Sequence, residues 1–242
     1  MAKIGMFIST ANECLFQTEA SLLKEHYKDI INKNHYDIDV FSFQGGLSID
    51  KTLLYDDTIL CNADDRDIAL KYLEVFKFIV SEGLQYEWLI FTNTSTIVNL
   101  SLIYNNVHSL QDDCVYTQFI ISGHDNRNYE AVGNFQLFNF KNIRSIMDNY
   151  ENSYYETLPY NPGHADDIVT SYIYEKIGMN LVQLDNAINM FDAIGLGVNN
   201  NYNISESAII RYRTYLPRDY RIEVEPMILQ LLITQLKNMS YT

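Results

Sequence analysis

The strongest constraint on the fold of this chain is an alternation, present from its first residues, between short apolar runs and segments with apolar residues at helical spacing. Residues 3–8 form an apolar run typical of a buried strand, and residues 15–31 carry Leu and Ile side chains at the period of a helix. Residues 38–43 alternate polar and apolar side chains and lead to Gly45 and Gly46. Because a strand, a helix and a second strand in this order build a parallel sheet, the opening predicts an α/β fold.

The same alternation continues along the rest of the chain. We expect strands at residues 88–91, 115–121, 133–138, 181–184 and 209–215, and helices at residues 68–80, 97–103, 139–149, 165–177 and 226–237. Asp65 or Asp67 suits the first turn of the helix over residues 68–80, and Pro226 suits the first turn of the last helix. The Asn- and Gly-rich residues 195–207 are expected to form a loop.

Composition favours one globular domain and limits its ligands. A chain of 242 residues with 47% hydrophobic residues has enough apolar surface for a single large core. Its net charge of −14 gives no general attraction for nucleic acid or anionic membranes, so a phosphate-bearing ligand must meet a local cluster of Arg and Lys. The cysteines, Cys14, Cys61 and Cys114, lack zinc-ligand spacing and are expected to be reduced core residues.

The sequence also suggests where the protein works. Its first apolar run is too short for a signal peptide, and no stretch approaches the roughly 18–20 apolar residues that a membrane helix needs. We therefore expect a cytoplasmic protein without a membrane span. The frequent use of Asn and Tyr suggests an AT-rich genome, either bacterial or viral, and for a viral gene the expected location is the host cytoplasm.

Four segments, taken in order, resemble the landmarks of one enzyme family. They are DDRDIALKYLEVFKFIV, YEWLIFTNTSTIVNL, GNFQLFNFKNIRSI and HADDIVTSYIYEKIG. Their order and spacing over residues 3–179 are similar to those of the fringe-like, β-1,3-type glycosyltransferases of the GT-A fold. The resemblance implies one GT-A-like, Rossmann-like domain over residues 1–242, with a mixed, mostly parallel sheet flanked by helices. Its nucleotide-binding half would cover about residues 1–110, and its acceptor-side half about residues 111–242.

The activity implied by the resemblance is transfer of a sugar, with inversion, from a nucleoside diphosphate sugar to a hydroxyl of a glycan or glycoconjugate. The expected donor is a UDP-sugar. In the family an acidic motif holds a divalent cation, which neutralises charge on the leaving diphosphate. This chain has Asn93, Thr94 and Ser95 at that place, and none of them is an anion. We therefore assign no metal ligand and leave the need for Mn²⁺ or Mg²⁺ open, as well as a plain role for this run as the cap of the next helix.

Arginines near the end of the chain are the candidates to supply the missing positive charge. Arg211, Arg213, Arg218 and Arg221 occur within eleven positions, and Arg211 and Arg213 would face the same side of a strand. They would clamp a diphosphate, or they pair with neighbouring carboxylates on a solvated surface. Lys71 matches a Lys of the family's helix, which implies a place in the nucleotide pocket; a surface Lys is the alternative.

Two adjacent carboxylates are the candidates for the catalytic base. Asp166 and Asp167 match the acidic pair of the family, one of which takes the proton of the acceptor hydroxyl as it attacks the anomeric carbon. Asp167 is preferred, because it precedes the apolar pair Ile168-Val169 as the base of the family tends to. The helix dipole alone also favours acidic residues in a first turn, so a purely structural role stays open.

The remaining candidates would bind the nucleoside. Ser9 and Thr10 follow the first strand, where the GT-A fold places the base and ribose. Asp39 lies on the second predicted strand and would also bind the nucleoside, or it is a buried acid satisfied by backbone N–H groups.

Two other functions fit the same residues. One is a non-catalytic relative that binds a sugar nucleotide or a glycan after losing turnover. The other is a phage enzyme that glycosylates modified DNA bases; its local support is the arginine cluster, and the net charge opposes it. The sequence predicts neither the donor sugar, nor the acceptor, nor an oligomeric state.

Overall fold

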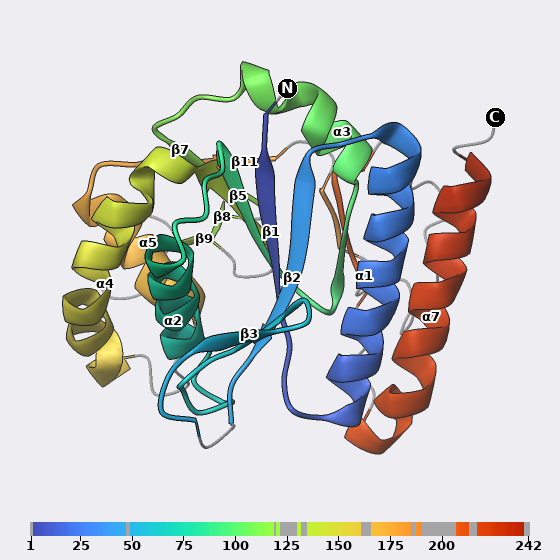
Figure 1. Ribbon diagram of the computed structural model, residues 1–242, viewed down its shortest axis with the longest axis horizontal. Helices are drawn as coiled ribbons and strands as arrows, with labels where there is room; N and C mark the ends of the chain where they lie inside the picture. Colours follow the sequence, from blue (N-terminus) through green and yellow to red (C-terminus); the bar gives the residue numbers. More distant parts are fainter. Residues whose placement is uncertain are drawn as a thin grey trace.

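A mixed eight-stranded sheet forms the middle layer of the molecule (Figure 1). The computed structural model describes residues 2–46, 49–118, 120–121, 130–131, 135–160, 166–184, 187–189, 207–212 and 217–239. The strand order is β11-β7-β10-β5-β1-β2-β4-β3. The strands are β1 (Ile4–Ser9), β2 (Ile38–Gln44), β3 (Leu53–Tyr55), β4 (Thr58–Leu60), β5 (Trp88–Asn93), β7 (Cys114–Thr117), β10 (Phe135–Asn139) and β11 (Asn180–Gln183).

Most pairs in this sheet are parallel, as the sequence predicted. Strand β1 runs parallel to β2 and β5, β2 runs parallel to β4, and β11 runs parallel to β7. Strand β10 is antiparallel to both of its neighbours, and β3 is antiparallel to β4. The carboxyl ends of β1, β2 and β5 therefore meet at one edge of the sheet, which is the lower edge in Figure 1.

Helices cover both faces of the sheet (Figure 1). Helices α2 (Ile68–Ser81), α4 (Ile143–Thr157) and α5 (Asp166–Lys176) cover one face, and α1 (Cys14–Asn34), α3 (Leu100–Asn106) and α7 (Arg218–Met239) cover the other. Strand β5 is apolar throughout its first residues because it is buried on both faces: Ile90 packs in the core under α1, whereas Leu89 and Phe91 pack in the core under α2. Short 3₁₀ turns at Val107–Ser109, Phe140–Asn142 and Leu158–Tyr160 join some of these elements.

Two smaller sheets complete the fold. Strand β13 (Ile209–Arg211) lies between β12 (Ala187–Asn189) and β6 (Thr96–Val98), and β8 (Ile120–Ile121) pairs with β9 (Glu130–Ala131). Strand β13 is antiparallel to β6, with Arg211 opposite Thr96. This pairing brings the C-terminal part of the chain beside the turn that follows β5.

Helix α2 begins where a side chain caps it. Asp67 accepts a hydrogen bond from the backbone N–H of Leu70 at 2.9 Å, so it is the N-cap, one position before the first turn in which it was expected. The second oxygen of the same carboxylate accepts a hydrogen bond from the Tyr154 hydroxyl of α4 at 2.6 Å. Asp67 therefore fixes both the start of α2 and its position against α4.

The helix predicted for residues 97–103 is partly wrong. Residues 96–98 form strand β6, and α3 begins only at Leu100, after Asn99 accepts a hydrogen bond from the N–H of Leu102 at 3.1 Å. Thr96, Ile97 and Val98 are consecutive β-branched residues, and all are buried, so a strand paired with β13 suits them better than a helical turn.

The start predicted for the last helix is also wrong. Helix α7 begins at Arg218, so Pro226 lies inside it rather than in its first turn. A proline inside a helix loses one backbone hydrogen bond. The ion pair of Arg221 with Glu225 and the packing of Leu229 and Leu232 in the core under α1 hold the helix together around it. Most of the loop predicted for residues 195–207 lies outside the described residues.

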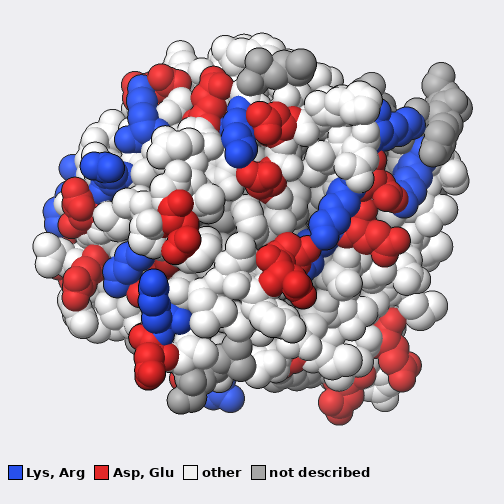
Figure 2. Space-filling model, viewed as in Figure 1, with Lys and Arg blue, Asp and Glu red and all other residues white. Residues whose placement is uncertain are grey.

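The described surface carries mixed charges. On the face shown in Figure 2, acidic and basic side chains are interspersed, and the basic ones do not gather into one continuous patch. None of the described helices is both long and apolar enough to cross a membrane.

Candidate donor-binding site

A pocket of about 360 Å³ opens at the carboxyl ends of β1 and β5. We call it the donor pocket, because the resemblance in sequence predicts that the sugar-nucleotide donor would bind here. Its walls include several residues that the sequence singled out: Ser9, Thr10, Lys71, Asn93, Thr94 and Ser95. Strands β1 and β5 are parallel neighbours in which Ser9 lies opposite Asn93, so the two polar runs that follow these strands meet at one place.

The neutral run after β5 forms a tight turn. The side-chain oxygen of Asn93 accepts three hydrogen bonds, from the N–H of Ser95 at 3.1 Å, the hydroxyl of Ser95 at 2.8 Å and the hydroxyl of Thr96 at 3.1 Å. An Asn that binds the backbone two residues ahead is typical of such turns. The run therefore turns the chain from β5 into β6, and the capping role that was an alternative for it belongs to Asn99.

The C-terminal part of the chain holds this turn from the other side. The N–H of Tyr212 donates to the carbonyl of Ser95 at 3.0 Å, and its hydroxyl donates to the carbonyl of Thr94. Burial raises the pKa of Tyr212 well above its usual value, so the hydroxyl stays protonated and remains a donor. The backbone carbonyls of Thr94 and Ser95 therefore both accept hydrogen bonds from Tyr212, which fixes the conformation of the turn.

The turn does not fit a divalent cation. Mg²⁺ and Mn²⁺ prefer carboxylate oxygens, and the turn contains none. Its one amide oxygen, on Asn93, already accepts three hydrogen bonds. Across the part of the chain that the structure describes, no three His, Cys, Asp or Glu side chains lie close enough together to hold a metal.

Lys71 is a buried part of the donor pocket. Its side chain is only 2% exposed, which rules out the alternative of a surface lysine. The ammonium donates to the carbonyl of Thr10 at 3.0 Å and to Oδ1 of Asp65 at 3.4 Å. Asp65 also accepts hydrogen bonds from the N–H groups of Asn12 at 2.8 Å and Gly45 at 3.2 Å. Lys71 and Asp65 therefore tie the loop after β1 to the end of β2.

Of the predicted arginines, the structure places Arg221 in the wall of the donor pocket. Its guanidinium forms two hydrogen bonds with the carboxylate of Glu225, at 2.8 and 2.9 Å. Arg211 lies on β13 and is not part of the pocket wall, Arg213 lies outside the described residues, and Arg218 begins α7 with a side chain that is not described.

A second buried carboxyl lies near Arg221. Glu19 of α1 is fully buried, and this burial, followed by the charge of Glu225, raises the pKa of Glu19 to about 8. At neutral pH Glu19 is therefore mostly protonated. Arg221 is left with Glu225 as its charged partner, so the Arg221–Glu225 pair is neutral as a whole.

The predicted catalytic pair, Asp166 and Asp167, is not part of the donor-pocket wall. Asp166 is buried at the start of α5; burial, followed by the charge of Asp167, raises the pKa of Asp166 to about 7, while Tyr72 and Lys71 act in the opposite direction. Asp167 is half-buried, and its Oδ1 accepts a hydrogen bond from the N–H of Ile168 at 3.0 Å. Lys71 and Tyr72 thus connect the pair to the pocket.

Asp39 does not belong to the donor pocket. It lies at the amino end of β2, opposite Gly5, whereas the pocket lies at the carboxyl ends of the strands. Its carboxylate forms an ion pair with Lys3 at 3.2 Å, and both side chains are nearly half exposed. This position does not support the prediction that Asp39 binds the nucleoside. It does not support the alternative either, because the Asp39 carboxylate is not buried.

The sequence missed several wall residues. Asp65 and Arg66 precede α2, and the polar run that contains them was attributed to the helix start alone. A polar run before a helix at the carboxyl edge of a parallel sheet is a usable signal for such residues. Glu13 and Phe16, at the start of α1, also line the pocket, and no sequence pattern marks them.

Comparison with solved structures identifies the fold. A glycosyltransferase involved in the glycosylation of the major capsid of PBCV-1 matches with 11% identity and a TM-score of 0.54, over 93% of this chain and 99% of that chain. The galactosyltransferase LgtC, in complex with donor and acceptor sugar analogues, matches with 10% identity and a TM-score of 0.56, over 96% of each chain. No protein-family model and no curated protein matches the sequence.

At these identities the likeness shows the fold. The chain has the GT-A-like fold of glycosyltransferases, with a mixed, mostly parallel sheet between helices, as the sequence predicted. Neither structure is described as fringe-like, so the resemblance to that branch of the fold remains a prediction.

Proposed function

We propose that this protein is a glycosyltransferase that moves a sugar from a nucleoside diphosphate sugar, with UDP as the first choice of nucleotide, to a hydroxyl of a glycan or glycoconjugate. The observation that carries the proposal is the donor pocket. It joins the loop after β1, the buried Lys71, the turn after β5 and Arg221 at the carboxyl edge of a GT-A-like sheet. Ligands of open α/β sheets bind at this edge.

The similar structures support the same activity. One neighbour is described as a galactosyltransferase in complex with donor and acceptor sugar analogues, and the other as a glycosyltransferase involved in the glycosylation of a viral major capsid. Both likenesses extend over nearly the whole of each chain, so the pocket edge is part of the shared fold.

Protein cations take the place of a metal in this proposal. Arg221 and Arg66 line the donor pocket, and a guanidinium binds phosphate oxygens with two parallel hydrogen bonds. Glu225 engages Nε and Nη2 of Arg221 and holds the guanidinium in one orientation, which reduces the entropy cost of binding and leaves the Nη1 side to face a phosphate. The ammonium of Lys71 already donates hydrogen bonds to Thr10 and Asp65, so its main role is to fix the loop after β1.

The acceptor-side chemistry is assigned to the acidic pair. The acceptor oxygen forms its bond to the anomeric carbon as the bond from that carbon to the diphosphate breaks, and Asp167 takes the proton of the acceptor hydroxyl. Asp167 is preferred over Asp166 because it is less buried, and because an Asp166 whose pKa is raised to about 7 retains its proton in part at neutral pH. A single displacement of this kind inverts the anomeric centre.

A non-catalytic donor-binding protein is the second candidate. It is favoured by one observation, the absence of Asp166 and Asp167 from the described wall of the donor pocket. In that case the chain would bind a nucleotide sugar but would not turn it over.

Release of UDP from a panel of UDP-sugars, with and without simple glycan acceptors, tests the proposal. We expect release by the wild type, a loss of about 100-fold or more in Asp167→Asn, and a smaller loss in Asp166→Asn. Glu151→Gln, an exposed change on α4, serves as the control. Tight UDP binding without release from any donor would favour the binding protein, and no binding would refute both candidates.

A further inference from the structure

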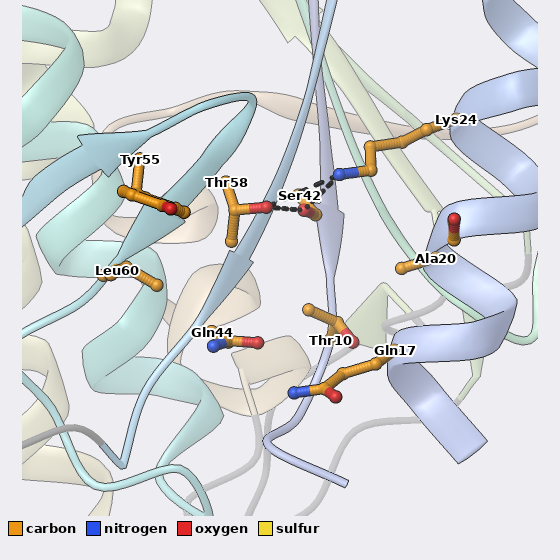
Figure 3. A pocket seen from close by; sticks show the side chains of 10 residues that line it. Thr10, Gln17, Ala20, Lys24, Ser42, Gln44, Tyr55, Thr58 and Leu60 are labelled. Carbon is orange, nitrogen blue, oxygen red and sulfur yellow. Dashed lines mark hydrogen bonds between the residues drawn. The ribbon is translucent and has the colours of Figure 1, made fainter. Parts of the chain in front are cut away.

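A second pocket, of about 250 Å³, adjoins the donor pocket at Thr10. It lies between α1 and the strands β2 and β4, and the β3–β4 hairpin forms its outer wall (Figure 3). We call it the hairpin pocket. Its volume is below the ~300–1,000 Å³ of sites for drug-sized ligands, so it suits a single ring rather than a whole nucleotide sugar.

Neutral polar groups form most of its lining. Figure 3 shows Ser42, Gln44 and Thr58 on the strands facing Gln17 and Lys24 of α1. The hydroxyls of Ser42 and Thr58 are 2.8 Å apart and hydrogen-bonded, so they have fixed positions. The side-chain amide of Gln44 and the hydroxyl of Ser21 also line the pocket and form no hydrogen bond with other described residues; an amide can both donate to a ligand and accept from it.

The hydroxyl of Thr10 is a second, independent observation that points to a ligand site. Its hydroxyl oxygen is buried, and no described residue forms a hydrogen bond with it. Buried hydroxyls in folded proteins nearly always have a partner. Because Thr10 lines both pockets, and its backbone is already held by Phe43 and Lys71, its hydroxyl is available to a ligand in either.

The charge of the hairpin pocket argues against an anion. Lys24 is its charged side chain, and it forms an ion pair with Asp57 besides hydrogen bonds to Ser42 at 3.2 Å and Thr58 at 3.4 Å. Lys28 also pairs with Asp57, but it lies on the solvent side with 57% exposure and outside the lining. A phosphate would have to compete with Asp57 for Lys24, whereas a neutral ligand would not.

An aromatic ring completes the outer wall. Tyr55 of β3 is 67% exposed, and its ring stands at the mouth of the hairpin pocket beside Leu60 (Figure 3). A saccharide ring has hydroxyls at its edge and C–H groups on its faces, so it suits amides and hydroxyls on one side and an aromatic ring on the other.

We propose that the hairpin pocket binds one neutral saccharide ring, as a carbohydrate site separate from the donor pocket. The site would hold a glycan against the protein beside the loop after β1. It does not depend on the proposed transferase activity, because a binding protein with the same fold would use it equally well.

Titration of the ¹⁵N-labelled protein with the methyl glycosides of glucose, galactose, mannose and N-acetylglucosamine tests this site by NMR. We expect at least one glycoside to shift amide signals of α1 and of β2 to β4. Gln44→Ala should weaken its binding about tenfold, because the ring loses an amide partner. Ser21→Phe, at an exposed position of α1, should fill the pocket and abolish binding. Gln230→Ala, the same change on the exposed side of α7, should leave the affinity unchanged.

The proposal is overturned if no glycoside shifts these signals, if the shifts persist in Ser21→Phe, or if inorganic phosphate produces them in place of the sugars. Titration of the wild type with UDP separates this proposal from the transferase. A protein that binds a glycoside in the hairpin pocket but never binds UDP would refute the proposed function and support the saccharide site.

Discussion

At the scale of single residues, Asp65 connects several segments of the donor-pocket wall. One carboxylate receives the N–H of Asn12, the N–H of Gly45 and the ammonium of Lys71. Gly45 itself leaves no room for a side chain, because a Cβ there would lie 2.5 Å from the carbonyl oxygen of Ala63. The loop after β1 and the end of β2 are therefore both held by backbone N–H groups that donate to one carboxylate.

Replacing this anion tests its role. Asp65→Asn keeps the shape of the side chain but leaves the buried Lys71 without its negative partner, so we expect a loss of roughly 1–3 kcal/mol of stability and about tenfold weaker UDP binding. Urea unfolding and calorimetry measure the two effects. Asp148→Asn, an exposed change on α4, is the control. Unchanged UDP affinity in Asp65→Asn would contradict the role given to Asp65.

The raised pKa of Glu19 predicts how the stability of the protein depends on pH. Its pKa is about 8 in the folded protein and near 4.5 as an ordinary Glu, so the unfolded chain loses this proton at a lower pH than the folded chain does. Stability therefore falls as the pH rises from about 4.5 to 8. Glu19→Gln removes this loss, and we expect it to raise stability by roughly 3 kcal/mol at pH 8 and by far less at pH 5. Urea unfolding at the two pH values measures this difference. If Glu19→Gln changed the free energy of unfolding equally at pH 5 and pH 8, the pKa of Glu19 would not be raised in the folded protein.

At the scale of elements, Asp67 joins two helices. It caps α2 through Leu70 and accepts the Tyr154 hydroxyl of α4. We expect Asp67→Ala to cost about 2–3 kcal/mol, as both a cap and a hydrogen bond to a charged group are lost, and Tyr154→Phe to cost about 1–2 kcal/mol.

A double-mutant cycle separates these two contributions. The free energy of unfolding of all four proteins is measured with urea. Because Asp67 and Tyr154 share a hydrogen bond, Tyr154→Phe should lower this free energy only slightly once Asp67 is replaced by Ala. Tyr155→Phe, an exposed neighbour, is the control. Fully additive losses would argue against the hydrogen bond between Asp67 and Tyr154.

Elements with strong periodicity were predictable from the sequence, and those set by distant pairing were not. Helices α1 and α2 and strands β1, β2 and β5 lie close to their predicted positions, because their apolar faces repeat clearly. Strand β6 was taken for helix because its partner, β13, lies more than a hundred positions further along the chain. The hairpin of β3 and β4 has only short strands and exposed side chains on β3, so periodicity gave no signal for it.

At the scale of the whole molecule, the donor pocket depends on chain topology. Parallel pairing of β1 and β5 brings Ser9 to Asn93, and this much follows from predicting a parallel sheet. The position of Arg221 cannot be predicted in this way, because it requires β13 to pair with β6 and α7 to pack against α1. The sequence indicated an arginine cluster but could not identify Arg221 as the member that reaches the pocket.

The same topology explains how a GT-A-like pocket can lack an acidic motif. In the C-terminal part of the chain, Tyr212 forms hydrogen bonds with the neutral turn, and Arg221 of α7 places its guanidinium in the pocket wall. Our central proposal is that guanidinium N–H groups, those of Arg221 foremost, bind the donor diphosphate in place of a metal.

Calorimetric titration with UDP, first with a chelator and then with manganese, tests this claim most directly. To avoid leaving Glu225 unpaired, the double variant Arg221→Gln/Glu225→Gln is compared with Glu225→Gln alone, and Arg144→Gln on the exposed side of α4 is the control. We expect UDP to bind in the presence of the chelator, manganese to change the affinity by less than about twofold, and loss of Arg221 to weaken binding about tenfold or more. Binding that requires manganese, or that is unchanged without Arg221, would contradict a metal-free site built on Arg221.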